Sequence, residues 1–290
     1  MRIAILVPDA DYPEPWHWTF DPEAEALRNA GADVEAVSWT GDRDLSSFDL
    51  VLPLLVWGYH LDFPRWIALL DRAERDQWPM VNPPALLRWN SDKAYLAELA
   101  ELGVSTVPTL AVEACTDADL EQARRHFDTE WLVIKPPVSA SATGTHRLGL
   151  KDDVPEDSRR RPMIIQPFIE EIGRTGEFSL MLFAGEFSHC VVKRPSPGDF
   201  RVQPHHGGVS FPSTPPSGAE ELAKQALSRA PAKAIYARVD IVADDEGTLR
   251  IMELELIEPA LFLDYSPAST TLFTNAILSC AQKATALSPR

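Results

Sequence analysis

Two segments joined by a short acidic turn decide the fold of this chain: YARVDIVA at 236–243 and TLRIMELEL at 248–256. Each alternates apolar and charged residues, which is the period of a half-buried strand. A four-residue turn between them predicts an antiparallel hairpin. In that register Arg238 lies opposite Glu253, and Asp240 lies diagonal to Glu253.

The same alternation sorts the side chains of this hairpin by face. The apolar ones share one face, and the charged ones share the other: Arg238, Asp240, Glu253 and Glu255. A solvated face with mutually tolerated charges is the plain alternative. However, neighbouring carboxylates repel each other unless a cation lies between them, and Mg²⁺ prefers oxygen ligands. The pattern therefore also fits a magnesium site at the three carboxylates, with Arg238 placed to meet a phosphoryl group or a developing oxyanion.

A second charged feature lies upstream, where the apolar segment WLVIKPP at 131–137 reaches Lys135 and is followed by SASATGT at 139–145. Small side chains let backbone N–H groups approach phosphate oxygens, and a lysine adds a positive charge. A solvent-exposed lysine with an ordinary turn after it is the alternative. The sequence has neither the P-loop spacing nor the Rossmann glycine pattern, so any nucleotide site must be of another kind.

Composition limits the classes of function. The 290 residues allow about two domains, and 45% apolar with 24% charged residues is typical of a globular protein. The net charge of −16 disfavours nucleic acid and anionic membranes as partners. No apolar run approaches the roughly 20 residues needed to span a bilayer. Three scattered cysteines predict neither a disulfide framework nor a zinc site, and we expect a reducing, cytoplasmic setting.

The N-terminal part alternates predicted strands and helices, which is typical of a small parallel α/β sheet. The strands are expected at 3–7, 34–38 and 50–56, and the helices from Asp21 to Gly31, from Asp62, and from a Ser91 cap to Gly103.

Strands predominate in the remainder, and their close spacing predicts antiparallel pairs. They are expected at 131–135, 163–167, 177–183 and 187–193, followed by a long loop at 195–218, a helix at 219–227, the hairpin within 234–257 and a final helix at 268–285.

Taken together, these residues resemble the ATP-grasp superfamily of carboxylate ligases, over nearly the whole chain. The stretch NSDK at 90–93, with its following helix and GVSTVPT at 103–109, is similar to the entry of the family's central domain. The stretch VIKP at 133–136 is similar to its second nucleotide-binding segment. The resemblance implies that Lys93 and Lys135 contact ATP phosphates.

The resemblance also implies roles for the later segments. Gln166, Pro167, Phe168 and Ile169 would cradle adenine, Glu177 would hold the ribose hydroxyls, and the four charged hairpin residues would match the family's arginine and magnesium carboxylates. Residues 193–208 resemble the loop of glutathione-synthetase-like ligases and ribosomal-protein glutamate ligases. Closer still, LVWGY at 55–59, WNSDK at 89–93 and ELELIEP at 253–259 resemble the O-ureido-serine cyclo-ligase group of cycloserine biosynthesis.

We therefore expect a substrate-binding α/β domain at residues 1–90 and an ATP-grasp module at 91–290, with a nucleotide lid at 91–168 and a catalytic part at 169–290. Mg-ATP, with one or two ions and Mn²⁺ as a substitute, would activate a small carboxylate for attack by an amine, between molecules or within one.

We expect Lys193, Arg194 and Arg201 to hold the carboxylate, and Trp57 and Tyr59 to line the apolar side of its pocket. An interface-packing role for the two aromatic residues is the alternative. The sequence is compatible with a homodimer and does not decide the oligomeric state. A nucleotide-binding regulator without turnover and a metal-dependent hydrolase are the alternative functions.

Overall fold

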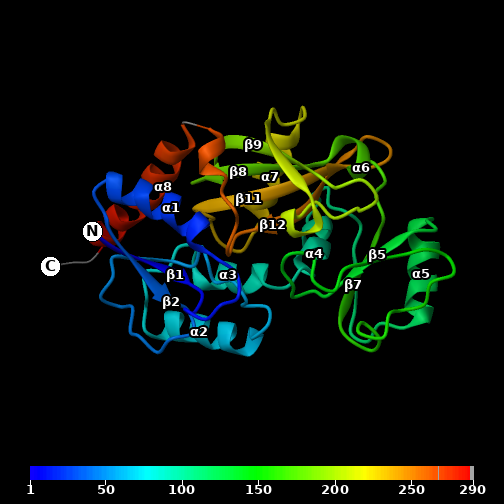
Figure 1. Ribbon diagram of the computed structural model, residues 1–290, viewed down its shortest axis with the longest axis horizontal. Coiled ribbons are helices and arrows are strands. Elements are labelled where there is room, and N and C mark those ends of the chain that lie inside the picture. The colour runs from blue at the N-terminus through cyan, green and yellow to red at the C-terminus, as the bar shows by residue number, and fades with distance from the viewer. Residues whose placement is uncertain (267, 288–290) are drawn as a thin grey trace.

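The computed structural model describes residues 1–266 and 268–287, which form three sheets. In Figure 1 a small parallel sheet lies on the left, a five-stranded antiparallel sheet in the centre and a four-stranded antiparallel sheet on the right. The predicted combination of one parallel α/β unit with two further sheets is confirmed. None of the helices in the described residues is long and apolar enough to cross a membrane.

The N-terminal sheet has the strand order β2-β1-β3 and is parallel throughout, as predicted. Its elements are β1 (Arg2–Val7), α1 (His17–Asn29), β2 (Asp33–Ser38), β3 (Leu50–Leu52), α2 (Phe63–Arg75) and α3 (Pro84–Asn90). The strand predicted to reach Val56 ends at Leu52, because Pro53 has no N–H to donate to a sheet.

Helix α1 begins at His17, not at the predicted Asp21. The carbonyl of Trp16 accepts the N–H groups of Thr19 and Phe20, so a turn already forms before the acidic residue. Pro22 therefore lies inside the helix, and the burial of Phe20 outweighs the single backbone hydrogen bond that the proline removes.

Ser91 was predicted to cap the helix that follows it, but it instead ends α3. Its hydroxyl donates to the carbonyl of Leu87 at 2.8 Å and accepts from the indole of Trp66 at 2.9 Å. The next helix, α4, spans Tyr95–Glu101. The segment between the two helices therefore forms a bend that carries Lys93.

The central sheet has the strand order β10-β9-β8-β11-β12 and is antiparallel. Its elements and the helices beside it are β8 (Glu177–Phe183), β9 (Glu186–Arg194), the 3-10 turn η1 (Pro204–His206), β10 (Val209–Ser213), α7 (Ala219–Arg229), β11 (Tyr236–Ala243), β12 (Leu249–Glu255), η2 (Leu263–Tyr265) and α8 (Ser269–Leu287). The stretch predicted to be a loop thus contains a sheet-edge strand, which its prolines concealed.

The hairpin register differs from the predicted one. Arg238 pairs with Glu255, and Asp240 pairs with Glu253, because a β-bulge follows Asp240 and the turn is one residue longer. The prediction that the four charged residues share a face is confirmed. The bulge also puts Ile251 on the buried face, in place of the predicted Met252.

The right-hand sheet has the order β4-β7-β5-β6 and has its own small core. Its elements, with the short helix that leads out of it, are β4 (Leu110–Val112), α5 (Asp117–Phe127), β5 (Leu132–Lys135), β6 (His146–Leu148), β7 (Met163–Pro167) and α6 (Ile172–Thr175). A capping box at Thr116 fixes the start of α5.

The face of the central sheet opposite α7 is divided into two halves. At one end, apolar side chains of β8, β9 and β11 pack against α1 and α8 in one core: Met181, Phe183, Val191, Tyr236 and Phe273. At the other end the same strands present charged and polar side chains instead. The charged half lies toward the four-stranded sheet, because Glu253 and Asp240 both act on the pKa of Lys135 at the end of β5.

Candidate active site

A buried network of ion pairs occupies the charged half of the central sheet. The Nζ atom of Lys193 lies 2.5 Å from Oε1 of Glu177 and 3.1 Å from Oδ2 of Asp240. The hydroxyl of Ser179 donates to Asp240 at 2.6 Å. Arg238 donates to Asp240 at 2.9 Å and also forms an ion pair with Glu255. One continuous charged network therefore runs across four neighbouring strands.

Strand pairing builds this network directly. Glu177 lies opposite Lys193, and Asp240 lies opposite Ser179 on one side and Glu253 on the other. The sequence pattern predicted Lys193 as a contact of the substrate carboxylate and assigned no role to Ser179. The alternation of residues 177–183 and the pairing of adjacent strands would have placed both side chains on the charged face.

The network fixes the charge of its central members. Burial alone would lower the pKa of Arg238, but Asp240 and Glu255 raise it above its ordinary value. Burial would raise the pKa of Asp240, but Arg238 and Lys193 hold it below its usual range. Burial does raise the pKa of Glu255, to about 7, against the attraction of Arg238. A further cation beside Glu255 would keep this carboxylate charged, which suits a bound metal ion.

Two lysines border the network, one in the bend between α3 and α4 and one at the end of β5. The Nζ atom of Lys93 lies 3.2 Å from Oε1 of Glu253 and donates to the carbonyl of Ser139 at 2.5 Å. Lys135, at the end of β5, is buried, and burial lowers its pKa although Glu253 opposes this effect. The structure thus brings together both predicted nucleotide lysines and the predicted carboxylates.

Side chains from outside the sheet hold β12, which carries Glu253 and Glu255. The amide of Asn90 donates to the carbonyl of Leu254 at 2.8 Å and accepts from the N–H of Leu256 at 2.9 Å. The hydroxyl of Tyr95 accepts from the N–H of Leu254 at 2.7 Å. The outer edge of β12 is therefore anchored to the bend that also carries Lys93.

An apolar patch continues the charged face toward the predicted adenine segment. Ile169, Val107 and Val242 form a small buried cluster, with Met252 against it. Gln166 is buried and donates to the hydroxyl of Thr109 at 2.8 Å. The adenine segment, the apolar patch and the ion-pair network therefore follow one another along the sheet.

The three cations predicted to hold a substrate carboxylate do not form one patch. Lys193 lies within the buried network. Arg201 donates to Asp199 through two nitrogens, at 3.1 and 2.8 Å, and Arg194 is exposed. The three cations were not brought together, because the alternation of β9 turns Lys193 toward the charged face of the central sheet and Arg194 away from it.

The two predicted aromatic residues also separate. Tyr59 is buried against Trp66, with ring centroids 5.6 Å apart. Trp57 lines a cavity of about 250 Å³ beyond the carboxyl ends of β1 and β2, together with Asp9, Tyr12 and Trp39. Hydroxyls of Ser38 and Thr40 both donate to Asp9, and these bonds lower its pKa.

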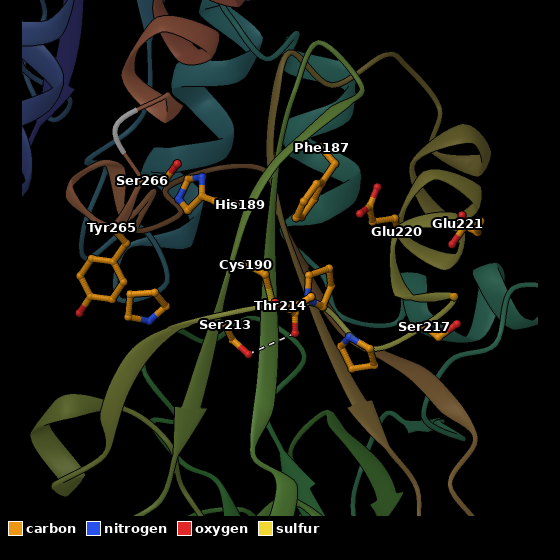
Figure 2. Close-up of a pocket in the computed structure, with 14 residues that line it drawn as sticks. Phe187, His189, Cys190, Ser213, Thr214, Ser217, Glu220, Glu221, Tyr265 and Ser266 are labelled. Carbon is orange, nitrogen blue, oxygen red and sulfur yellow. Dashed lines mark hydrogen bonds between the residues drawn. The ribbon is translucent and has the colours of Figure 1, made fainter.

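A larger cavity, of about 590 Å³, lies away from the ion-pair network. Figure 2 shows its lining side chains: His189 and Tyr265 stand on one side of β9, and Phe187 and Glu220 on the other. Both ring nitrogens of His189 have partners, the hydroxyl of Ser188 at 2.9 Å and the carbonyl of Leu261 at 3.0 Å. This cavity holds none of the predicted site residues.

Within the described residues, no three His, Cys, Asp or Glu side chains form a ready metal cluster. The donor set nevertheless fits Mg²⁺, which is usually bound by one or two carboxylates together with substrate phosphates rather than by an all-protein cage. Glu253 and Glu255 have side chains 26% and 29% exposed, whereas Asp240 is 4% exposed and surrounded by Arg238, Lys193 and Ser179. The two glutamates are therefore the accessible oxygen donors.

Sequence comparison relates the chain to one characterised protein over nearly its full length. Residues 3–82 match the family described as the N-terminal domain of D-cycloserine synthetase DcsG. The cycloserine biosynthesis protein DcsG of Streptomyces lavendulae is 28% identical over 304 aligned positions, which cover 96% of this chain and 98% of that protein. The crystal structure of D-cycloserine synthetase DcsG matches with a TM-score of 0.82 at 24% identity, covering 98% of this chain and 99% of the other.

More distant structures share the fold. D-alanine–D-alanine ligase from Bacillus anthracis matches with a TM-score of 0.69 at 14% identity, covering 98% of each chain. The ATP-grasp ligase PsnB, in complex with its minimal precursor, Mg and ADP, matches with a TM-score of 0.65 at 14% identity, covering 96% of this chain and 97% of PsnB. The chain is therefore similar over nearly its full length to the cycloserine biosynthesis protein DcsG, and it has the fold of DcsG and of the ATP-grasp ligases.

Proposed function

We propose that this ligase uses Mg-ATP to activate a small amino-acid-like carboxylate as an acyl phosphate, which then reacts with an amine or a similar nucleophile. One observation carries the proposal: Arg238 is held by Asp240 and Glu255 at the point where Lys93 and Lys135 approach the same face. A regulator that had lost turnover would not need this complete set of charges. A hydrolase acting through the carboxylates would not need the two lysines.

The nucleotide would lie along the divided sheet face. The apolar patch around Ile169 and Met252 suits adenine, and Gln166–Ile169 would border it. Glu177, held by Lys193, is the proposed ribose contact. Lys93 and Lys135 would meet the phosphates, since both ammonium groups face Glu253. We assign this module to residues 91–290, with the lid at 91–168, and substrate binding to residues 1–90.

Glu253 and Glu255 would hold Mg²⁺, with Asp240 as a further predicted ligand. When bound, the ion neutralises negative charge on the transferring phosphoryl group. The proposal includes one or two bound ions, with Mn²⁺ able to substitute for Mg²⁺.

The side chains of the site act by position and charge. A substrate carboxylate oxygen attacks the γ-phosphorus, and the bond to the leaving ADP oxygen breaks with its electron pair going to ADP. Arg238 is kept in one orientation by Asp240 and Glu255, so its N–H groups face the transferred group without further reorganisation. Lys93 and Lys135 add positive charge on the opposite side. The amine then attacks the acyl carbon, and phosphate leaves.

For the acceptor, we propose that Trp57 lines the substrate side of the N-terminal domain. Its cavity contains a carboxylate and three aromatic rings, from Asp9, Tyr12, Trp39 and Trp57. Such a lining suits a small molecule with a cationic amino group, because aromatic faces and carboxylates both attract cations. Tyr59 would support this wall from behind.

ADP release tests the proposal. The wild type is assayed with Mg-ATP and a panel of D- and L-amino acids that includes D-alanine and D-serine, and hydroxylamine is added to trap any acyl phosphate as a hydroxamate. We expect one or more panel members to stimulate ADP release and to yield hydroxamate.

Glu253→Gln should reduce both signals at least about 100-fold, because it removes a metal ligand and the partner of Lys93. The exposed Glu186 on β9 supplies the matched control, Glu186→Gln, which should behave as wild type. Binding of Mg-ATP without any stimulated ADP release would indicate a regulator instead. ADP release that needs no carboxylate and gives no hydroxamate would indicate hydrolysis.

A further inference from the structure

Two buried polar atoms near the phosphoryl-transfer residues have no hydrogen-bond partner among the described residues: Oε2 of Glu258 and Nδ1 of His60. Glu258 follows β12, three residues after Glu255, and His60 lies in the loop before α2. A buried polar atom without a partner costs about 1–3 kcal/mol. Each of these atoms could therefore receive its missing partner from a bound molecule.

The surroundings of Glu258 place it beside the reacting groups. Burial, with Glu255 adding to it, raises the pKa of Glu258 well above its ordinary value, while Lys93 and Arg238 act in the opposite direction. Glu258 thus lies within electrostatic reach of the two cations proposed to act on the transferred phosphoryl group.

Glu258 also lies at the N-terminal domain, because the residue before it, Ile257, packs in one core with Tyr59 and Trp66. It raises the pKa of Tyr59 together with burial, and it acts on Tyr12, which lines the cavity beside Trp57. His60 adjoins Tyr59, with ring centroids 5.9 Å apart, and burial with Lys93 lowers its pKa to about 4, so its imidazole is neutral at pH 7. Glu258 therefore lies between the aromatic cavity and the phosphoryl-transfer residues, where an acceptor would meet an acyl phosphate.

A second buried glutamate shows that this placement is specific. Oε2 of Glu23, on α1, is also buried without a partner, but burial is the only influence that raises its pKa. Glu23 lies within electrostatic reach of Tyr236 rather than of the two cations. Among the described residues, two glutamates thus have a buried oxygen without a partner, and Glu258 is the one next to the proposed chemistry.

We propose that Glu258 receives the nucleophilic amine of the acceptor: its Oε2 accepts an N–H hydrogen bond from that nitrogen and takes up the proton released during the attack. The inference rests on the proposed ligase function and adds the acceptor-binding group to it. The nitrogen–carbon bond forms, the carbon–oxygen bond to phosphate breaks, and phosphate leaves with that electron pair. The proton of the attacking nitrogen passes to Glu258. His60, which adjoins Tyr59 and is neutral at pH 7, adds no competing positive charge.

The test separates the amine step from phosphoryl transfer. Glu258→Gln keeps the side-chain volume and removes the carboxylate that would take up the proton. With the panel amino acid that best stimulates the wild type, we expect amine-dependent product formation to fall about 100-fold or more, which is the usual contribution of a positioned proton acceptor. Hydroxamate formation should stay within threefold of wild type, because hydroxylamine is uncharged at neutral pH and needs no proton acceptor to attack. Calorimetric affinity for Mg-ADP should also be unchanged.

Two further variants complete the design. Glu23→Gln, the same substitution at the other unpartnered glutamate, should leave product formation, hydroxamate formation and Mg-ADP affinity as in wild type. Glu258→Asp keeps a carboxylate on a shorter side chain and should retain intermediate product formation; it also decides the question if Glu258→Gln fails to bind Mg-ADP.

Three outcomes would overturn the inference. Product formation by Glu258→Gln at the wild-type rate would exclude the amine contact. Equal losses of product and hydroxamate in Glu258→Gln would assign Glu258 to phosphoryl transfer instead. Absence of both ADP release and hydroxamate in the wild type, with every panel member, would refute the proposed function and this inference together.

Discussion

Replacement of Lys193 by methionine should destabilise the fold through Glu177. The Lys193 side chain is 9% exposed and contacts two carboxylates, of which Glu177 is 10% and Asp240 4% exposed. In the variant Asp240 keeps its contacts with Arg238 and Ser179, whereas Glu177 loses its 2.5 Å ion pair. Breaking a buried pair by removing one partner costs about 3–5 kcal/mol, and because one of the two carboxylates stays paired we expect about 3 kcal/mol.

Urea denaturation followed by far-UV circular dichroism measures this loss in the free energy of unfolding. The double variant Lys193→Met/Glu177→Gln should recover about 2 kcal/mol, because a neutral amide replaces the unpaired carboxylate. The exposed lysine of α7 provides a control, and Lys224→Met should change stability by less than about 0.5 kcal/mol. A loss below 1 kcal/mol in the single variant, or a double variant no more stable than the single one, would refute this account of the network.

Three further predictions concern other parts of the molecule. Burial raises the folded-state pKa of Glu23 above its ordinary 4.5, so the folded protein keeps a proton that the unfolded chain releases, and stability falls as pH rises above about 4.5. Glu23→Gln should therefore stabilise the protein more at pH 8 than at pH 4 in thermal unfolding. Equal effects at both pH values would contradict this. Asn90→Ala leaves the N–H of Leu256 without a partner, whereas the carbonyl of Leu254 keeps the Tyr95 hydroxyl at 3.2 Å, so the variant should cost about 1–3 kcal/mol in urea denaturation. A change under about 0.5 kcal/mol would show that water replaces the amide. A contact between His205 and the carbonyl of Ser141, at 3.0 Å, joins segments 139–145 and 195–208. Both segments should gain hydrogen-exchange protection when Mg-ATP binds. Unchanged exchange in both would argue against their closing over the nucleotide.

The sequence predicted most of the site because strand alternation is a local property. Arg238, Asp240, Glu253 and Glu255 were correctly assigned to one face even though their register was not, since a shift by two residues keeps each side chain on its face. The bulge after Asp240 could not be foreseen, because it lies where the backbone of Ile251 bonds to Ser105 and Val107, which are distant in sequence.

Features that depend on distant contacts were missed. The start of α1 at His17 is set by the burial of Phe20 against the core, not by a local capping residue, and Ser91 ends one helix because its hydroxyl bonds to Trp66 and Leu87. The sequence predicted Lys193 as part of a patch that holds the substrate carboxylate, because its partner Glu177 lies on another strand. Glu258 carries no sequence signal of its own, since its unpartnered oxygen is visible only once the neighbouring segments are in place.

The two contacts of Lys93 couple segment 139–145, here called the flap, to the carboxylate site at Glu253. The ammonium group bonds at once to the carbonyl of Ser139 and to Glu253, so any cation that binds Glu253 competes with the lysine for the same oxygen. A cation that displaces Lys93 changes what holds the flap, and by thermodynamic reciprocity whatever restrains the flap must change the affinity for that cation by the same factor. A substitution in the flap, far from any carboxylate in sequence, should therefore be read out as altered cation affinity.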